Sequence, residues 1–589
     1  MDGHAAGWPS VRISAIMVSM VRRTHLLPLL VLAAMAVSMV GTVTPAAAAT
    51  RTLYVDGKNG SDGNSGTSLS SAFKTVAKGL AEVYREGTGR VADRVVIVGY
   101  NDYVYRERSE ASVYLPGTSS APIVIEGLGY GQAGYVRPTI SGATVVSWPG
   151  DTRWTRPDAT KYPNVWQIPW TTPIPGYESS VRTYRQERLF MDVTQPLVRP
   201  RSTPSLADLQ KTPGSQYWNG TKLYVRLGLW SGTLASTDPR QHTIEIPTHK
   251  GILVGSGSAY VTIRGLMIRH TNMAVGFTGD AHHNTVESVD ASYNYGMGFW
   301  TKSHHNVFRS ISGRRNTIQL VKLDNGAQYN LIERATGIEN LGQGVKLTGS
   351  GTAYNTIRFS TFADGKNVPV AAGQYGGYIQ GILIENGAHH NYIEDNTIRN
   401  MRRGLYLYQT ASTSKTLSYN KVKRNLFLDN SAAVYIWDSR SGGASSGTVS
   451  FSRNVYAGNG YAIQSEGRTS NKTFDHETIY DSRPAKGLGA VYLKGSYGSI
   501  TMKNSIVVKS TAYGVRADSG SKLTISYSTV SGTTSGSRSG SVSWSSTNRT
   551  SDPAFLATTR TSADYLYIGP GSPVYAAGSV KDPIGARAR

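Results

Sequence analysis

A repeat of about two dozen residues limits most strongly what this chain can fold into. Segments that open with asparagine, followed two positions later by isoleucine, valine or another apolar residue, recur at gaps of 22, 24, 25 and 36 residues. They begin at Asn284, Asn306, Asn330, Asn355 and Asn391. Each segment holds two or three short alternating β patterns, separated by Asn, Gly or Ser, which is typical of strands and turns. The longest gap predicts one repeat plus an insertion at 366–378.

A β-rich repeat of this length predicts a parallel β-helix, in which each repeat forms one coil and strands of successive coils stack about 4.8 Å apart. Leucine-rich repeats have a similar period, but their L-x-x-L-x-L signature is absent from the sequence. At 589 residues the chain is too long for one ordinary compact core, which also favours a repeat architecture. It has no cysteine, so we expect a large regular core, rather than disulfides, to stabilise it.

The segment 52–84, "TLYVDGKNGSDGNSGTSLSSAFKTVAKGLAEVY", predicts a strand, a Gly/Asn/Asp loop and an amphipathic helix. Such a helix could cap the open end of a solenoid and protect its strand edges. This opening, with the coils of roughly 250–530, resembles the secreted proteins of the pectate-lyase-like superfamily. The resemblance implies a right-handed parallel β-helix that acts on carbohydrate. It leaves the activity open, because that superfamily contains lyases, glycoside hydrolases, epimerases and non-enzymatic adhesins.

The N-terminus has the pattern of a signal peptide. Arg22 and Arg23 precede a long apolar run, and the small residues "TPAAAAT" follow, so we expect cleavage after Ala49 and secretion. No later apolar run is long enough to cross a bilayer. The predicted organisation is a signal peptide (1–49), an N-terminal cap with the first coils (50–144), an inserted β subdomain rich in Trp and Pro (145–245), the main β-helix (246–535), and a C-terminal coil or capping segment (536–589).

The net charge of +23 favours an anionic partner. Removing residues 1–49, which carry three basic residues and one acidic residue, leaves about +21. No helix-turn-helix, zinc-finger or RNA-recognition pattern is present, which argues against nucleic acid. Together with the signal peptide, the charge predicts an extracellular acidic polysaccharide as the partner. We expect a monomer without a membrane partner.

The triplet Val-Lys-Leu occurs at 321–323 and again, 24 residues later, at 345–347. Strand alternation places Val and Leu inward and the lysine outward, so Lys322 and Lys346 should stack on neighbouring coils. Stacked ammonium groups repel each other, which favours an anion site in which one lysine could act as a base. The alternative is a surface ion pair between Lys322 and Asp324, with Lys346 as a solubilising charge.

The same alternation predicts two outward rows on one β face. The first row contains Trp300, Lys322, Lys346, Leu383, Tyr406 and Tyr435. The second, two residues further along, contains Lys302, Asp324, Thr348, Glu385, Tyr408 and Trp437. Outward aromatic rings suit stacking on sugars, so we interpret Trp300 and the last two residues of each row as carbohydrate contacts. The alternative is an aromatic ladder buried beneath the 366–378 insertion.

Two carboxylate pairs are candidates for acid–base chemistry. Glu339 and Asp364 each lie nine residues after a repeat asparagine and should stack roughly 5 Å apart, a spacing that suits a retaining glycosidase. Asp324 and Glu385 lie two coils apart, nearer 10 Å, as in an inverting enzyme. Arg315, in the same row as Glu339, offers the alternative of a corner salt bridge.

Consecutive histidines occur beside three of the repeat asparagines, at 282–283, 304–305 and 389–390. Imidazoles stacked across coils could bind a metal. The alternative, which we favour at this stage, is that they are turn residues next to an asparagine ladder.

Three functions compete. The first is a polysaccharide lyase, in which Lys322 or Lys346 is the base and Arg315, Lys302 or Arg403 binds a uronate; the resemblance implies such a basic residue as the base. The second is a glycoside hydrolase that uses one of the carboxylate pairs, and the third is a non-catalytic binding solenoid. We place the lyase first. Calcium is a possible cofactor, although 284–300 carries only one aspartate, Asp290.

Overall fold

The computed structural model describes residues 51–107, 112–172, 187–192, 195–198, 205–228, 234, 236–368, 379–410, 416–439, 447–495 and 497–587. The predicted signal peptide lies outside these residues, as does most of the 366–378 insertion. Residues 50–589 form one compact unit. Within the described parts of the chain, no helix is both long enough and apolar enough to cross a bilayer.

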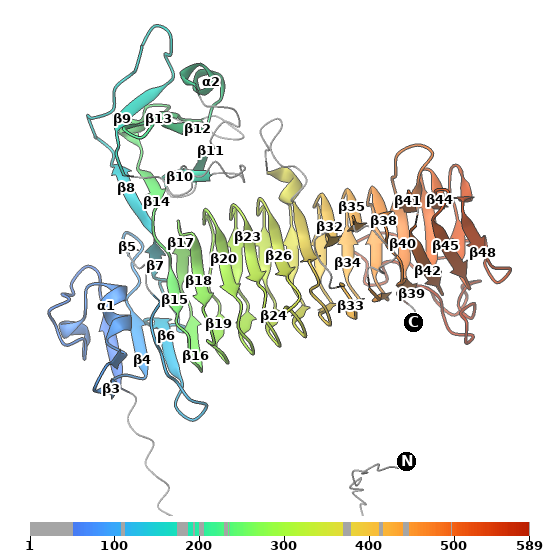
Figure 1. Ribbon diagram of the computed structural model, residues 1–589, viewed down its shortest axis with the longest axis horizontal. Coiled ribbons are helices and arrows are strands. Elements are labelled where there is room, and N and C mark those ends of the chain that lie inside the picture. The colour runs from blue at the N-terminus through green and yellow to red at the C-terminus, as the bar shows by residue number, and fades with distance from the viewer. Residues whose placement is uncertain are drawn as a thin grey trace, which may run out of the picture. The chain divides into compact units, whose positions relative to one another are not determined.

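The fold is a parallel β-helix with three long parallel sheets, whose strands lie side by side in chain order (Figure 1). The first sheet has fifteen strands. They are β1 (Thr52–Val55), β4 (Arg94–Ile97), β6 (Ile123–Gly127), β16 (Val261–Arg264), β19 (Thr285–Glu287), β21 (Val307–Arg309), β24 (Leu331–Glu333), β27 (Thr356–Arg358), β30 (Tyr392–Glu394), β33 (Asn420–Lys423), β36 (Val449–Ser452), β39 (Lys472–Asp475), β42 (Ser499–Lys503), β45 (Lys522–Ser526) and β48 (Val542–Trp544).

The second sheet has twelve strands and carries the predicted outward rows, apart from Lys302 and Asp324, which lie just beyond the ends of their strands. The twelve strands are β15 (Ile252–Val254), β18 (Met273–Phe277), β20 (Met297–Thr301), β23 (Gln319–Leu323), β26 (Gln343–Thr348), β29 (Gln380–Glu385), β32 (Arg403–Gln409), β35 (Ala432–Asp438), β38 (Tyr461–Gly467), β41 (Gly489–Lys494), β44 (Tyr513–Ala517) and β47 (Gly536–Gly540).

The third sheet has nine strands. They are β22 (Ser312–Arg314), β25 (Thr336–Ile338), β28 (Thr361–Ala363), β31 (Thr397–Arg399), β34 (Leu426–Leu428), β37 (Val455–Ala457), β40 (Thr478–Ser482), β43 (Ile506–Ser510) and β46 (Thr529–Ser531). A three-stranded sheet precedes it, made of β5 (Val104–Arg106), β7 (Thr139–Ser141) and β17 (Met267–Arg269).

The remaining elements lie before residue 248, apart from one short 3-10 helix. A seven-stranded sheet contains β8 (Ala143–Ser147), β14 (Ile244–Pro247), β10 (Glu187–Met191), β11 (Gln195–Val198), β12 (Ser215–Trp218), β13 (Lys222–Arg226) and β9 (Trp166–Pro169), and β2 (Tyr84–Arg85) pairs with β3 (Gly89–Arg90). The helices are α1 (Val76–Ala81) and α2 (Leu206–Lys211), and the 3-10 helices are η1 (Leu69–Ser71), η2 (Pro239–Gln241) and η3 (Gly365–Asn367).

One continuous hydrophobic core fills the β-helix. Each strand points its Val, Ile, Leu or Phe side chains inward, and the same position is apolar in coil after coil. On the second sheet, for example, Val321, Val345 and Ile382 lie opposite one another and are fully buried. Because strand side chains alternate, the residue that follows each of these must point outward. The core therefore determines which residues form the outer face.

Buried asparagines connect the coils at the corners, as the repeat predicts. The backbone N–H of Asn284 donates to Asn306 Oδ1 at 3.0 Å, and the N–H of Asn306 donates to Asn330 Oδ1 at 2.9 Å. Further ladders of the same kind run through Asn294, Asn316 and Asn340, and through Asn396, Asn425 and Asn454. A buried backbone group without a partner destabilises a fold, so these amides fix the register between coils.

The first sheet carries a charge ladder on its outer face that the sequence analysis did not identify. Acidic and basic residues alternate from coil to coil through Glu126, Arg264, Glu287, Arg309, Glu333, Arg358, Glu394 and Lys423. Glu333, for example, accepts hydrogen bonds from Arg309 at 2.6 Å and from Arg358 at 2.8 Å. On this face neighbouring charges within the ladder are of opposite sign, and the ladder ends where Lys423 lies opposite Ser452.

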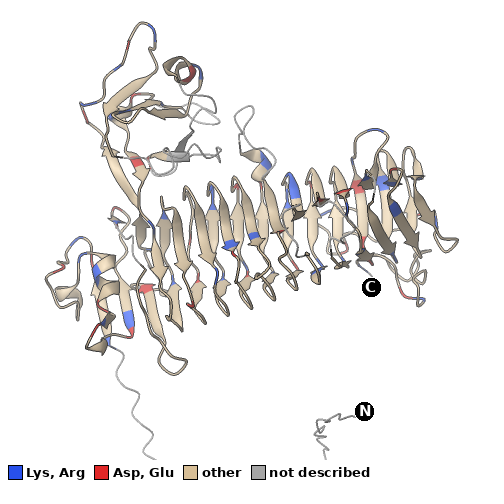
Figure 2. Cartoon of the chain, viewed as in Figure 1, with Lys and Arg blue, Asp and Glu red and all other residues tan. Residues whose placement is uncertain are grey.

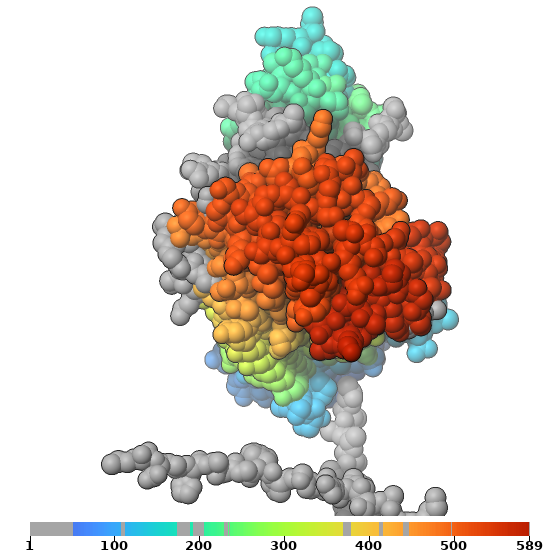
Figure 3. Space-filling model, turned by 90° about the vertical axis from the view of Figure 1, so that its right-hand side faces the viewer, coloured from blue at the N-terminus to red at the C-terminus, as the bar shows by residue number. Residues whose placement is uncertain are grey.

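The outer face of the third sheet becomes apolar toward the C-terminus, where the last residues of the chain cover it. Ile506 and Val508 on β43 pack against Ile568 and Val574 from the C-terminal segment. Figure 3 views the C-terminal end of the coils, where these last residues, in red, form the surface.

One ladder position holds a glutamate instead of an asparagine, and it yields a test of the fold. Glu477 is fully buried, and the N–H of Asn454 donates to its carboxyl at 3.2 Å. Burial raises the pKa of Glu477 well above its ordinary value of 4.5. As the pH rises above 4.5, the unfolded chain therefore loses this proton before the folded protein does, and the folded state loses relative stability.

We predict that Glu477→Gln stabilises the protein increasingly as the pH rises above about 5, by about 1.4 kcal/mol per pH unit until the folded pKa is reached. Urea unfolding at several pH values measures this. Glu333→Gln is the matched control: ion pairs lower the pKa of Glu333 although its burial opposes this, so that variant should lose stability at neutral pH and little at pH 3. Parallel pH dependences in the two variants would contradict the prediction.

Candidate functional site

The register of the second sheet confirms the first predicted outward row and the second from Thr348 onward, while Lys302 and Asp324 follow directly after the ends of β20 and β23. Trp300 lies opposite Lys322, Lys322 opposite Lys346, and Lys346 opposite Leu383. Leu383, Tyr406 and Tyr435 continue the first row. In the second row Thr348, Glu385, Tyr408 and Trp437 are opposite one another in turn. The repeated lysine thus stands in the same place on two neighbouring strands, β23 and β26.

Each of these lysines has a carboxylate partner. Lys322 Nζ lies 2.7 Å from Asp324 Oδ2, and Lys346 Nζ lies 2.8 Å from Glu385 Oε1. We call these four residues the charge quartet. Two neighbours complete it: Trp300 Nε1 donates to Asp324 at 3.3 Å, and the Thr348 hydroxyl donates to Glu385 at 2.9 Å.

The quartet departs from the charge pattern of the rest of the β-helix. On the first sheet the three arginines of the ladder each lie between two glutamates, whereas Lys322 and Lys346 are direct neighbours. Basic segments in the middle of the coil stack are visible in blue in Figure 2. Like charges opposite each other destabilise a sheet. Here Asp324, two residues along the same coil, compensates Lys322, and Glu385, on the next strand, compensates Lys346.

The environment keeps Asp324 ionised. Burial alone would raise its pKa, but hydrogen bonds from Lys322, from the backbone of Asn325 and from Trp300 outweigh it, so the pKa of Asp324 is below its usual value. The side chain of Asp324 is 30% exposed and that of Glu385 is 10% exposed. The quartet thus contains one accessible carboxylate and one that is more enclosed.

The aromatic part of the face is more buried than the sequence pattern suggests. We expected Tyr406 and Tyr435 to be exposed, but their exposures are 8% and 9%. The two rings pack with Leu383 and Ala432, and the guanidinium of Arg403 lies over both, at 4.4 and 4.3 Å from their centroids. Burial raises the pKa of both phenols, that of Tyr435 to about 12. Tyr408 and Trp437 are only half-buried and stack at 4.8 Å.

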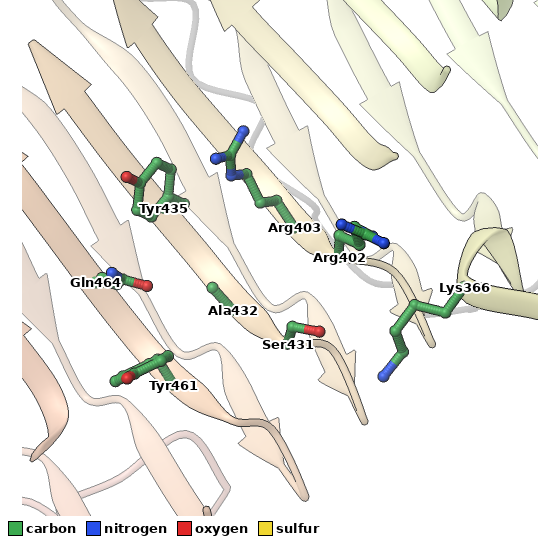
Figure 4. A pocket seen from close by; sticks show the side chains of 8 residues that line it. All are labelled: Lys366, Arg402, Arg403, Ser431, Ala432, Tyr435, Tyr461 and Gln464. Carbon is green, nitrogen blue, oxygen red and sulfur yellow. The ribbon is translucent and has the colours of Figure 1, made fainter. Parts of the chain in front are cut away.

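A pocket of about 510 Å³ opens beside this aromatic group (Figure 4). Its lining residues are Lys366, Arg402, Arg403, Ser431, Ala432, Tyr435, Tyr461 and Gln464. In Figure 4 the three basic side chains come from one side of the pocket, and Tyr435, Tyr461 and Gln464 from the other. Of these lining residues, the sequence patterns had identified only Arg403 and Tyr435 as candidates. Gln464 lies opposite Tyr435 and could have been found by extending the first row by one coil, whereas Lys366 lies in η3, outside any repeat pattern.

Glu339, Asp364 and Arg315 lie elsewhere, at the corner between the third and second sheets. All three have left-handed backbone conformations, with φ of 54°, 63° and 54°. Glu339 accepts from Arg315 at 2.8 Å and from Arg314 at 2.9 Å, and Asp364 pairs with Arg399 at 3.0 Å. Their carboxylates therefore take part in corner ion pairs, away from the outward rows.

Two further expectations concern cations. Lys302 is exposed just beyond β20, and within the described residues it forms no ion pair. Calcium would need several convergent oxygen ligands. Over the described ranges, no three His, Asp or Glu side chains are grouped so that they could hold a metal ion.

Comparison with known proteins places the fold. Residues 314–479 match the family described as the right-handed beta helix region, which confirms the predicted handedness for the coils that hold the quartet. A search of curated proteins found no match.

Several solved structures are similar at low identity. One is a complex of XylC with xylose (14% identity, 85% of this chain and 87% of that chain covered, TM-score 0.48). Another is the GH136 lacto-N-biosidase from Eubacterium ramulus (10%, 85% and 67%, TM-score 0.37). A third is a mutant of the periplasmic alginate epimerase AlgG (12%, 51% and 77%, TM-score 0.35).

The first ion pair of the quartet can be tested without a substrate. We predict that Lys322→Ala raises the pKa of Asp324 toward its usual range and lowers stability at pH 7 by less than about 1 kcal/mol, since the pair is partly exposed. Because a lowered carboxyl pKa stabilises the fold only where the group is ionised, the loss should disappear as the pH falls through that pKa. Carboxyl NMR titration and urea unfolding measure the two effects, with Lys302→Ala as the control. If both variants leave the titration of Asp324 unchanged, the ion pair is absent in solution.

Proposed function

We propose that this protein is a secreted carbohydrate-active enzyme that hydrolyses glycosidic bonds in an anionic polysaccharide, with the charge quartet as its active centre. The observation that carries the proposal is the quartet itself. It places two carboxylates, each with a lysine partner, on an open face beside aromatic rings and a basic pocket. A purely structural face has no need of adjacent like charges, as the alternating ladder of the first sheet illustrates.

The spacing of the carboxylates suits inverting hydrolysis. Asp324 follows directly after β23 and Glu385 ends β29, and β26 lies between these two strands, so their backbones are roughly 10 Å apart. Inverting glycosidases hold their two carboxyl groups about 6.5–9.5 Å apart, which leaves room for a water molecule on the far side of the sugar.

The two carboxylates then have different roles. Asp324, whose lowered pKa keeps it ionised, takes a proton from the attacking water. Lys346 Nζ lies 2.8 Å from Glu385, the more enclosed of the two, so the ammonium passes a proton through Glu385 to the oxygen of the leaving sugar. Lys346 then takes up a proton from the solvent, and Asp324 releases its own there. Lys322 holds Asp324 in position.

The rest of the face is suited to binding the chain. Tyr408 and Trp437 present half-buried, stacked rings, which pack well against sugar rings. The basic pocket offers guanidinium groups, which bind carboxylate or sulfate with two parallel hydrogen bonds. The net charge of about +21 on residues 50–589 supports an anionic substrate.

A lyase is the second candidate, because two in-register lysines beside a basic pocket could bind a uronate and remove its proton. A lysine that acts as a base must be uncharged, however. Both Lys322 and Lys346 lie within ion-pair distance of a carboxylate, which favours the charged ammonium form. This is why we place hydrolysis ahead of β-elimination.

Two parts of the architecture belong to the same proposal. The segment 1–49 would be removed on secretion. Helix α1, which contacts β1 and β4, would cap the first coils, and the seven-stranded sheet would be an inserted subdomain.

The reaction class can be determined directly. We predict that the mature protein (50–589) releases new reducing ends from an anionic polysaccharide without a rise in ultraviolet absorbance, and that a chelator has no effect. A panel of uronate-containing, sulfated and neutral polysaccharides covers the substrate classes, and NMR of the first product should show an inverted anomeric configuration. Rising absorbance would show a lyase instead, and make Lys322→Ala and Lys346→Ala the next variants.

The carboxylate roles predict large kinetic losses. Asp324→Asn and Glu385→Gln should each lower kcat by about 10²–10⁴-fold, the usual contribution of a positioned acid or base. Glu287→Gln, on the first sheet, is the matched control and should retain full activity. Near-normal kcat in both quartet variants would remove the quartet from the mechanism and return attention to Glu339 and Asp364.

The pocket predicts a charge-dependent effect on binding. Arg402→Gln should raise KM for an anionic substrate by about tenfold, because a hydrogen bond to a charged group contributes roughly 1.5–3 kcal/mol. It should leave KM for a neutral chain and kcat for both unchanged, and the difference should shrink at high salt. An equal change of KM on both substrates would show that the pocket does not recognise charge.

A further inference from the structure

A second cavity, of about 650 Å³, lies between the outer face of the third sheet and the segment that follows β48. On the sheet side, Tyr480, Val508 and Ser531 lie opposite one another in one outward row. Residues between 550 and 558 form the other side. The volume is within the usual range of small-molecule sites, about 300–1,000 Å³. We call it the C-terminal pocket, and its aromatic and polar lining includes Tyr480, Lys509, Ser531, Gly532, Asp552 and Phe555.

Hydrogen bonds hold the C-terminal segment in place on both sides of the pocket. At the start of the segment, Thr529 Oγ1 donates to the carbonyl oxygen of Ser551 at 2.7 Å. Further along, the N–H of Leu556 donates to the carbonyl oxygen of Tyr567 at 2.8 Å. The residues between these two points are therefore already in position, so a ligand would not have to order the segment when it binds.

Two aromatic rings stand at nearly a right angle in this pocket. Tyr480 and Phe555 are both half-buried, their ring centroids are 5.9 Å apart, and their planes meet at 81°. Rings arranged in this way offer a ligand two apolar surfaces, one beneath it and one beside it. Aromatic faces of this kind suit the C–H side of a sugar ring.

A cation and a carboxylate line the same pocket. Lys509 Nζ lies 5.1 Å from the ring centroid of Tyr480 and donates to its hydroxyl at 3.4 Å, which leaves further N–H donors of the ammonium group. Asp552 Oδ1 accepts from the N–H of Ala554 at 2.8 Å, and a carboxylate has capacity for several more hydrogen bonds. Both side chains belong to exposed residues, so a ligand can reach them.

These two charges differ from their neighbours in having no ion-pair partner. At the same corner of the preceding coils, Asp429 pairs with Arg560 at 2.5 Å and Asp481 pairs with Arg483 at 2.7 Å. Lys509 occupies the next position of that corner, directly after Asp481. Among the described residues, neither Lys509 nor the pocket carboxylate forms a salt bridge, although both face one cavity. A donor and an acceptor thus remain available.

Gly532 keeps the corner open where the pocket lies. Asp481, Lys509 and Gly532 follow one another at this corner, and all are left-handed, with φ of 53°, 59° and 60°. The first two show that a side chain can occupy this position. A Cβ atom added to Gly532 would lie 3.5 Å from the backbone nitrogen of Lys509, an ordinary contact. Crowding therefore does not require the glycine, and its missing side chain leaves space at the pocket.

We propose that the C-terminal pocket is a second carbohydrate site, which binds one or two units of a neutral glycan and does not cleave it. Sugar hydroxyls can accept from the ammonium of Lys509 and donate to the carboxylate of Asp552, while the sugar ring packs against Phe555. The two charges compensate each other, unlike the three basic residues of the pocket beside the quartet, so the site favours a neutral ligand.

This inference goes beyond the proposed hydrolysis and does not depend on it. The C-terminal pocket lies on the third sheet and includes no residue of the charge quartet or of the basic pocket. Its function would be to hold the protein on a polysaccharide, independently of any reaction on the second sheet.

The structure suggests two variants that change the pocket in different ways. Asp552→Asn removes the charge but keeps an oxygen that can accept from Ala554, so the turn there is retained. Gly532→Asn places a side chain in the open corner, and asparagine tolerates the left-handed conformation. Leu556→Ala is the matched control, because Leu556 is 50% exposed, follows Phe555 directly and does not line the pocket.

The test measures binding of cellotriose, xylotriose and triacetylchitotriose to protein 50–589 by calorimetry and saturation-transfer NMR. We expect at least one of these neutral trisaccharides to bind, with about tenfold or greater loss of affinity in both pocket variants. Leu556→Ala should bind within twofold of the unsubstituted protein, and thermal unfolding checks that each variant is folded. Absence of binding by all three trisaccharides, or unchanged affinity in either folded pocket variant, would overturn the proposal. These readouts stay valid if the quartet has no hydrolytic activity.

Discussion

The structure depends on coils that lie in register on one another, and buried asparagine amides maintain that register. Each amide accepts a backbone N–H of the preceding coil, as Asn306 does from Asn284 at 3.0 Å. A slip of one residue would leave these buried groups without partners and turn the core residues outward. This loss of hydrogen bonds and core packing would recur at every coil. A small free-energy difference per coil therefore adds up and specifies one register for the whole stack. Everything on the outer faces follows from that alignment.

Because register is fixed, each face becomes a set of rows, and the chemistry of a row can be compared along the stack. On the first sheet, acidic and basic residues alternate along the ladder. A strand that paired with the coil one removed from its proper neighbour would therefore place like charges opposite each other. On the second sheet, Lys322 and Lys346 are neighbours, and each requires a carboxylate from the adjacent row. Two faces of one fold thus use charge in different ways: one to strengthen alignment, the other to concentrate charge on an accessible surface.

Features that depend on period and alternation were accessible from the sequence. The coil length, the asparagine ladder and the outward rows follow from the repeat and from which positions are apolar. The structure confirms the ladder, the first row, and the second row from Thr348 onward. Features that depend on side-chain packing between rows were not. Arg403 covers Tyr406 and Tyr435 because a long side chain reaches two neighbouring rings, which spacing does not reveal. The basic pocket needs Lys366 from the irregular segment, so no repeat pattern contains it.

The long coil that starts at Asn355 shows what alignment by ladders permits. It has 36 residues, where the three coils before it have 22 to 25 and the coil after it has 29. The N–H of Asn355 still donates to Asn391 Oδ1 at 3.1 Å, and Gln343 still lies opposite Gln380. Residues can therefore be inserted between β28 and β29 without changing the register of the later coils. Lys366 of the basic pocket comes from this variable stretch. In a solenoid of this kind, selection can alter what a face recognises by lengthening a corner, while the coils that hold the reactive groups keep their sequence and spacing.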